Sequence, residues 1–464
     1  MAASELLRLG ITEAVEMIRA RQLSPVELVR AYLERIEKLN PSVNAYLTVT
    51  AEEALAAATA AEQAVMRGGA VGPLHGIPVA LKDNCDVAGV RTTAGTKFLR
   101  DNVAAADAEV AVQLRRAGAV FLGKLNMHEW AIGATTRNLC FGPCRNPWDR
   151  QRIPGGSSGG SGAALAADMA LAAVGTDTGG SVRIPASLNG VCGIRPTVGR
   201  VSNRGVVPVS WTFDTVGPMA RRAEDVAHVL RVVAGYDAED PTSVDVPVPD
   251  YLSEIHQGVK GLRVALLGGH FRTEPEPAVT QTVRRAAQVY AELGVRMEEV
   301  ELPGAEAAID RMSELLLTEA AAYHQARREE RPGDFAPDVM TRLKRGAAVT
   351  GVQYALAREV QRRWQRQLEQ VFGRYDLLLA PTCGMPAPLI EGSDGVETTR
   401  LLTRFTYPLT LALLPVLSIP CGFTTEGLPI GLQVAARHWQ ESLVLRAAWA
   451  YQQATDWHLR RPAL

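Results

Sequence analysis

The chain has 464 residues, 47% of them hydrophobic and 21% charged, which is ordinary for a globular protein and enough for a sizeable core. Its 49 basic and 50 acidic residues give a formal net charge of −1, so no overall field gathers nucleic acid or an anionic membrane. These totals exclude a disordered or fibrous chain and predict neither nucleic-acid nor membrane partners.

The first 70 residues are predicted to be helical. Ser24 is a helix cap followed by Pro25 at the first helical position, with Glu27 three residues after the cap. An alanine-rich stretch, 51–66, predicts a second helix that ends before two glycines. No basic region followed by an apolar stretch opens the chain, so we expect a cytoplasmic protein without a signal peptide.

From residue 76 onward, strand and helix patterns alternate. This alternation predicts an α/β fold with a central, mostly covered sheet. The predicted strands are 77–81, 119–122, 263–267, 375–380 and 417–420, and the predicted helices are 107–117, the stretch from about 276 to 370, and 441–454. The longest apolar stretch, 409–423, is broken by two prolines and is too short to cross a membrane. We therefore expect one domain over 1–464.

Six cysteines (Cys85, Cys140, Cys144, Cys192, Cys383 and Cys421) are too few and too scattered for a disulfide framework. Cys140 and Cys144 have a spacing that suggests metal, yet no second Cys or His pair completes a tetrahedral set. We expect reduced, buried cysteines and neither a metal nor a cofactor.

The most unusual stretch is the Gly/Ser run 155–162. A Gly/Ser run alone is typical of a flexible linker, but this one lies between Trp148 and an apolar segment. A phosphate-binding loop is the other alternative, and it lacks the closing Gly-Lys-Ser/Thr. The run therefore predicts a backbone packed closely against its surroundings.

Two further features carry chemistry. Gly179 and Gly180 directly precede Ser181, a pattern that lets backbone N–H groups converge as an oxyanion hole requires. Lys82 ends an apolar run, so its burial would lower its pKa and suit it to act as a base. A lone lysine at a strand end is more often a surface charge, so this feature needs the others.

Taken together, the lysine, the Gly-Gly-Ser-Ser-Gly-Gly-Ser loop and the Gly-Gly-Ser turn resemble the amidase-signature hydrolases. Ser157 follows Lys82 by 75 positions and Ser181 follows Ser157 by 24, and both spacings are similar to the family's. Further similar motifs follow in order at 123–127, 141–143, 145–148, 193–200, 214–218 and 428–433. The chain is identified as a member of this family, similar to the glutamine-hydrolysing component of the glutamyl-tRNA amidotransferase and its free-standing relatives.

The resemblance implies an amidase-signature fold, with a mixed sheet flanked by helices on both faces. Within one domain we expect N-terminal helices (1–70), the signature core (71–245), a helical insertion with strands (246–400) and a C-terminal return to the core (401–464).

The resemblance also implies the roles of the site residues. Ser181 is the expected nucleophile, Ser157 the proton relay after a cis peptide bond to Gly156, and Lys82 the base. The N–H groups of Thr178, Gly179, Gly180 and Ser181 are the expected oxyanion donors. We expect Ser158, Asp177 and Arg183 to support these loops.

The substrate is less determined by the sequence. We expect a C–N bond of a small amide, anilide or carbamate, with a urethanase-like activity included, cleaved through an acyl-enzyme on Ser181. A urea- or biuret-type hydrolase and the glutamine-hydrolysing subunit of a tRNA-dependent amidotransferase remain alternatives, and a non-enzymatic scaffold is disfavoured because the lysine and both serines are present. Against glutamine, the stretch before Pro408 has Arg404 where an acid would hold the amino group.

The candidates for the pocket are large apolar and charged side chains. The expected walls are Met127, Trp130, Trp211, Arg404 and Tyr407, with Cys85, Phe405 and Arg342 as further candidates. Core packing is the alternative for the apolar ones. The expected partners are a small-molecule substrate and a second copy of the chain in a homodimer.

Overall fold

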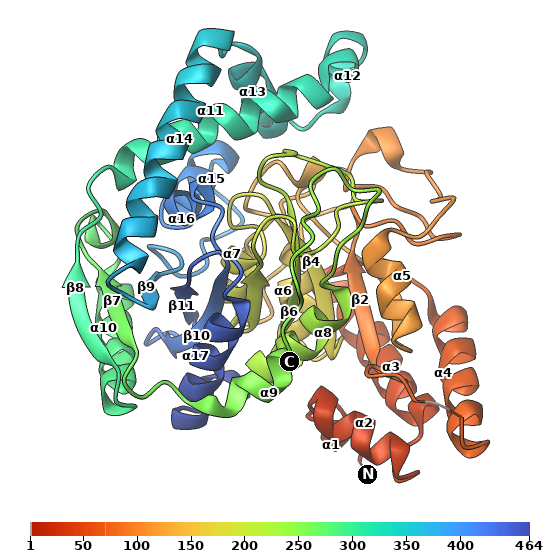
Figure 1. Ribbon diagram of the computed structural model, residues 1–464. Helices are drawn as coiled ribbons and strands as arrows, with labels where there is room; N and C mark the ends of the chain where they lie inside the picture. The colour runs from red at the N-terminus through yellow and green to blue at the C-terminus, as the bar shows by residue number, and fades with distance from the viewer. Residues whose placement is uncertain (1, 70) are drawn as a thin grey trace.

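The computed structural model describes residues 2–69 and 71–464 (Figure 1). Within these ranges the strands form one sheet in the order β1-β3-β2-β4-β6-β5-β10-β11-β9-β7-β8. The strands are β1 (Tyr46–Val49), β2 (Pro78–Lys82), β3 (Val120–Leu125), β4 (Ala172–Asp177), β5 (Cys192–Arg195), β6 (Thr215–Ala220), β7 (Arg263–Leu267), β8 (Arg296–Val300), β9 (Leu377–Pro381), β10 (Val416–Phe423) and β11 (Pro429–Ala435).

The sheet is mixed. β2 pairs in parallel with β3 and β4, and β7 pairs in parallel with β8 and β9, whereas the other pairings are antiparallel. The predicted α/β class is therefore confirmed. Because β2 and β4 are neighbours and parallel, their carboxyl ends lie together at one edge of the sheet, where Lys82 and Asp177 end the two strands.

Helices flank the sheet on both faces, as expected (Figure 1). The helices are α1 (Ala3–Leu6), α2 (Ile11–Arg19), α3 (Pro25–Val43), α4 (Ala51–Met66), α5 (Glu109–Arg116), α6 (Gly159–Ala166), α7 (Arg183–Asn189), α8 (Ala223–Val233), α9 (Tyr251–Glu254), α10 (Pro277–Glu292), α11 (Ala305–Tyr323), α12 (Gln325–Glu330), α13 (Pro337–Ala347), α14 (Gly351–Phe372), α15 (Gly395–Thr403), α16 (Tyr407–Leu411) and α17 (Glu441–Ala454). No helix in the described ranges is long and apolar enough to span a bilayer.

The N-terminal helix cap predicted at Ser24 is present at the start of α3. Ser24 Oγ accepts the N–H groups of Val26 and Glu27, and Pro25 occupies the first turn. One prediction is wrong in detail, because the stretch 276–370 is not wholly helical and contains β8. That strand is charged and solvent-exposed at the edge of the sheet, so it lacks the apolar pattern by which a buried strand is found.

Helices α11, α13, α14 and α15 form what we call the helical cap. In Figure 1, α11, α13 and α14 project above the sheet, over α15 and α16. Helix α11 packs against α13, α14 and α16. Residues of α11, α13 and α15 line one cavity together with Thr178, Gly179 and Ser181, so the helical cap covers the loop that follows β4.

Candidate active site

Lys82 is the last residue of β2, and its side chain is buried. Its Nζ donates to Ser157 Oγ at 2.6 Å and to Thr176 Oγ1 at 2.8 Å. Burial lowers the pKa of Lys82 to about 7, because removal from water disfavours the ammonium form more than nearby anionic groups favour it. Thr176 is held by Ser158, whose hydroxyl donates to its carbonyl oxygen and accepts its N–H. A partly neutral amine therefore contacts a serine hydroxyl at neutral pH.

The Gly/Ser run is a packed part of the core and not a linker. The Gly156–Ser157 peptide bond is cis, as the resemblance implied. The second half of the run is the first turn of α6, where a Cβ at Gly160 would overlap the carbonyl oxygen of Asn126. Only glycine permits this approach, which explains the composition of the run.

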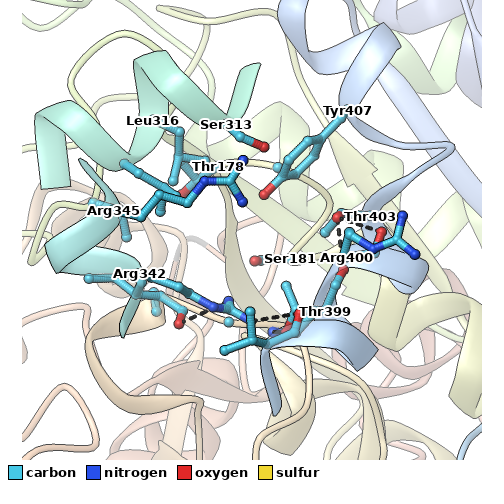
Figure 2. A pocket seen from close by; sticks show the side chains of 18 of the residues that line it. Thr178, Ser181, Ser313, Leu316, Arg342, Arg345, Thr399, Arg400, Thr403 and Tyr407 are labelled. Atoms are coloured by element: carbon cyan, nitrogen blue, oxygen red, sulfur yellow. Dashed lines mark hydrogen bonds between the residues drawn. The ribbon is translucent and has the colours of Figure 1, made fainter. Parts of the chain in front are cut away.

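Ser181 lies in the turn between β4 and α7, and it lines a cavity beneath the helical cap (Figure 2). Gly180 precedes it with φ of +129°, a conformation that side chains rarely adopt. The N–H of Ser158 donates to the carbonyl oxygen of Ser181 at 3.1 Å. The loops that carry Ser157 and Ser181 therefore meet beside Lys82.

Thr178 and Gly179, in the turn before Ser181, line the same cavity. The N–H of Gly180 donates to Asp177 Oδ1 at 2.8 Å, so it is already engaged. The N–H groups of Thr178, Gly179 and Ser181 have no acceptor among the hydrogen bonds of the described residues. Gly180 is therefore the one of the four expected donors whose N–H group is already bonded within the described residues.

Asp177 fixes this turn from below. It accepts from Arg183 Nε at 3.0 Å and from Arg195 Nη1 at 3.3 Å, and all three side chains are buried. Burial alone would raise the pKa of Asp177, but the two guanidinium groups hold it well below its usual range. Because the ionised carboxylate also accepts the N–H groups of Gly180 and Val182, it shapes the turn that carries the serine.

Two further threonines restrain the same turn. Thr178 Oγ1 donates to Asp214 Oδ1 at 2.6 Å, and Thr406 Oγ1 donates to the carbonyl oxygen of Gly179 at 2.6 Å. Thr406 immediately precedes α16, so the C-terminal part of the chain reaches the turn directly. The donors of the turn are thus held from both sides.

Of the expected pocket walls, Tyr407 and Arg342 line the cavity that contains Ser181. Cys85 and Phe405 are buried in the core and are not among its lining residues in the described part of the chain. Most of the lining comes from α11, α13 and α15 and from the segment 131–134 (Figure 2).

Four expected walls lie elsewhere. Met127 and Trp130 are buried in the core, and Trp211 is 51% exposed on the surface. Arg404 lies over the Phe405 ring and approaches Glu274 at 3.8 Å. None of the four lines the cavity that contains Ser181 among the described residues. Large apolar side chains mark packing at least as often as binding, and the sequence position of Arg404 does not give the direction of its side chain.

Several residues of the site were not predicted. Arg195 and Asp214 lie in motifs similar to the family's, at 193–200 and 214–218, where their contacts have no signal in the sequence itself. Thr176 lies inside the predicted serine turn, and its polar position at the end of a strand is the one available signal. Arg345 is one of many arginines on helical surfaces, and only the tertiary arrangement directs it to the cavity.

Comparison with known proteins agrees with this architecture. The family model described as Amidase matches residues 27–445. The chain is 42% identical to the A component of the glutamyl-tRNA(Gln) amidotransferase of Moorella thermoacetica, over 99% of each chain. Among solved structures it is similar to a chain of a vestigial protein complex described as revealing the evolutionary origins of an s-triazine catabolic enzyme. That chain is 36% identical, with a TM-score of 0.93 and coverage of 98% of this chain and 100% of the other.

A bacterial aryl acylamidase is also similar, at 28% identity and a TM-score of 0.89, with 98% of this chain and 99% of that chain covered. A site built from a buried lysine and two serines, on this sheet, is that of an enzyme acting on C–N amide bonds. The chain belongs to the amidase-signature family.

Proposed function

We propose that the protein is a serine amidohydrolase that cleaves the C–N bond of a small amide through an acyl-enzyme on Ser181. The observation that carries the proposal is the 2.6 Å hydrogen bond between Lys82 and Ser157, buried beside the loop whose Ser181 opens to the cavity. A buried lysine with its pKa near 7 is suited to accept a proton at neutral pH.

The proposed reaction uses the three residues as one unit. Ser181 Oγ attacks the amide carbon, and its proton passes to Ser157 while the Ser157 proton passes to Lys82. The oxyanion is bound by the N–H groups of Thr178, Gly179 and Ser181. The proton then returns through Ser157 to the leaving nitrogen, so that the C–N bond breaks and an amine or ammonia departs.

Water completes the cycle by the same route in reverse. It attacks the acyl-enzyme carbonyl, gives a proton to Lys82 through Ser157, and releases the acid as Ser181 regains its proton. Asp177, Arg183 and Ser158 are proposed to position the turn, since they contact its backbone and neighbours and do not line the cavity in the described residues.

For the substrate, we propose a primary amide of a small acid, hydrolysed with release of ammonia. The amidotransferase relatives, at about 40% identity, support this class over the anilides and carbamates expected from an apolar aromatic pocket. Of the aromatic and apolar walls on which that expectation rested, Tyr407 lines the cavity, whereas Met127, Trp130 and Trp211 do not. An anilide remains a second candidate, since the aryl acylamidase covers the chain almost completely.

The test is the release of ammonia or of an amine by the purified chain from a panel of simple primary amides, L-glutamine, anilides and carbamates. We expect turnover of primary amides by the chain on its own, and a loss of roughly 10³- to 10⁶-fold in Ser181→Ala. Ser161→Ala is the matched control, because Ser161 lies in the first turn of α6 and does not line the cavity. Unchanged turnover in Ser181→Ala would contradict the proposal.

A further inference from the structure

Two arginines on one face of α13 line the cavity. Arg342 and Arg345 lie one turn apart, and both line the cavity that contains Ser181 (Figure 2). Arg342 is buried and is held by the carbonyl oxygens of Ile132 at 3.3 Å and Gly395 at 2.7 Å. Its charge is therefore fixed in the wall with carbonyl dipoles, but no carboxylate, as hydrogen-bond acceptors.

Three acidic side chains lie around this wall without lining the cavity, and two of them, Asp338 and Asp394, lie close enough to Arg342 to attract its charge. Asp338, one turn before Arg342, pairs with His128 at 3.1 Å. Asp394 caps α15 by accepting the N–H groups of that helix's first turn. Glu397 pairs with Arg400 at 2.7 Å, so the third arginine of the lining already has a counter-ion.

The cavity itself carries no acid. Among the described residues its lining includes no aspartate or glutamate, and Arg345 has neither an ion pair nor a hydrogen-bond partner for its guanidinium group. The remaining polar side chains near Ser181 are neutral hydroxyls, among them Thr399, Thr403 and Tyr407. The lining of the cavity thus holds an excess of positive charge next to Ser181, and Arg345 is its arginine without a counter-ion among the described residues.

From this charge excess we propose that the substrate is an amide whose acyl part bears a carboxylate and no ammonium group. The inference rests on the proposed function and specifies its substrate class. Guanidinium groups bind carboxylates in charge-assisted hydrogen bonds, whereas an ammonium group placed here would meet arginines and no acid. The site therefore selects against L-glutamine, the substrate that the glutamine-hydrolysing alternative raised by the sequence would require.

Three compounds with the same scissile amide separate these charges. Glutaramate carries a carboxylate, glutaramide carries a second neutral amide in its place, and L-glutamine carries the carboxylate together with an ammonium group. Hydrolysis of glutaramate consumes one water, breaks the C–N bond, and yields glutarate and ammonia. We expect kcat/KM for glutaramate to exceed the values for the other two by about tenfold to a hundredfold.

Arg345→Gln tests whether the selectivity comes from this wall. Arg345 is exposed, so the variant is expected to fold, and the ratio of kcat/KM for glutaramate to that for glutaramide should fall about tenfold. Lys344→Gln removes a neighbouring cation on the same helix that does not line the cavity, and its ratio should match the parent's. Arg345→Glu should shift the preference from glutaramate toward L-glutamine. Equal kcat/KM for the three compounds, or an equal effect of the two glutamine variants, would overturn the inference.

Binding separates this inference from the proposed function. In Ser181→Ala, calorimetry should show glutaramate binding about tenfold or more tightly than glutaramide. Equal or undetectable binding overturns the substrate class. If glutaramate binds selectively but no amide on the panel is hydrolysed by the parent chain, the proposed function fails while the charge selection stands.

Discussion

Two regions of the molecule form the site, and they differ in how their charged side chains are held. The floor, comprising the ends of β2 and β4 and the two serine loops, holds its charges in a buried network of Lys82, Asp177, Arg183 and Arg195. The helical cap supplies the roof, where Arg345 reaches the cavity from an exposed position without an ion-pair partner in the described chain. A charge buried in a network is costly to change, whereas a side chain at the rim can change with little effect on folding. The chemistry is therefore expected to depend on the floor and the selectivity on the cap.

The largest expected effect comes from the floor. Lys82→Met keeps the length of the side chain and removes the only amine that contacts Ser157 among the described residues. We expect kcat to fall by roughly 10³-fold or more, because the lysine and serines act as one unit. The thermal midpoint should stay the same or rise, since a buried amine is replaced by an apolar group. Both are measured on one preparation, and a loss of activity that merely follows unfolding would contradict the role of base.

Asp177→Asn should weaken the ion pairs that hold the turn carrying Ser181. The amide is nearly isosteric, but two buried guanidinium groups would lose their counter-charge. Removing one partner of a buried ion pair typically costs about 3–5 kcal/mol, and the displaced turn should reduce kcat by about 10²-fold. Denaturant unfolding and steady-state kinetics measure the two effects. Parent-like stability with unchanged kcat would show that the network does not hold the floor.

The pH profile tests the floor without a substitution. Because burial lowers the pKa of Lys82 to about 7, the protonated form dominates below that pH and the neutral base above it. We expect kcat/KM to rise about tenfold per pH unit below pH 7 and to level off above it. Substrates that stay in one charge state over pH 5–9, such as glutaramide, avoid confusion with substrate titration. A flat profile over this range would exclude a base with this pKa.

The same contrast explains what the sequence could reveal. Lys82, Ser157 and Ser181 lie in glycine-rich motifs or at the end of an apolar strand, so the local sequence, together with the family resemblance that it carries, pointed to them. The α/β class and the ends of α4 and α17 also followed from periodicity and caps.

The cavity residues of the helical cap could not be identified from the sequence in this way. Arg345 comes to the serine turn only when α13 packs on α11, and nothing in its own segment distinguishes it from other surface arginines. Trp130 and Trp211 were expected in the pocket because they are large and apolar. The fold uses the first for core packing and leaves the second exposed, since the direction of a side chain is set by tertiary contacts. The sequence also gives no sign that the N–H group of Gly180 is bonded, because that hydrogen bond depends on where the fold places the Asp177 carboxylate.

The smallest expected effect comes from α14, in a part of the helical cap that lies away from the cavity. Thr350 is the N-cap residue of α14. Its hydroxyl accepts the N–H of Gln353, and the Gln353 side chain accepts the N–H of Thr350. Thr350→Ala should cost about 1 kcal/mol of unfolding free energy, and kcat should not change because this end of the helix does not line the cavity. Thr350→Ser, which keeps the hydroxyl, is the control in urea unfolding. A fall in kcat at unchanged stability would show that the floor and the cap are coupled through α14, and it would end the separation of chemistry from selectivity.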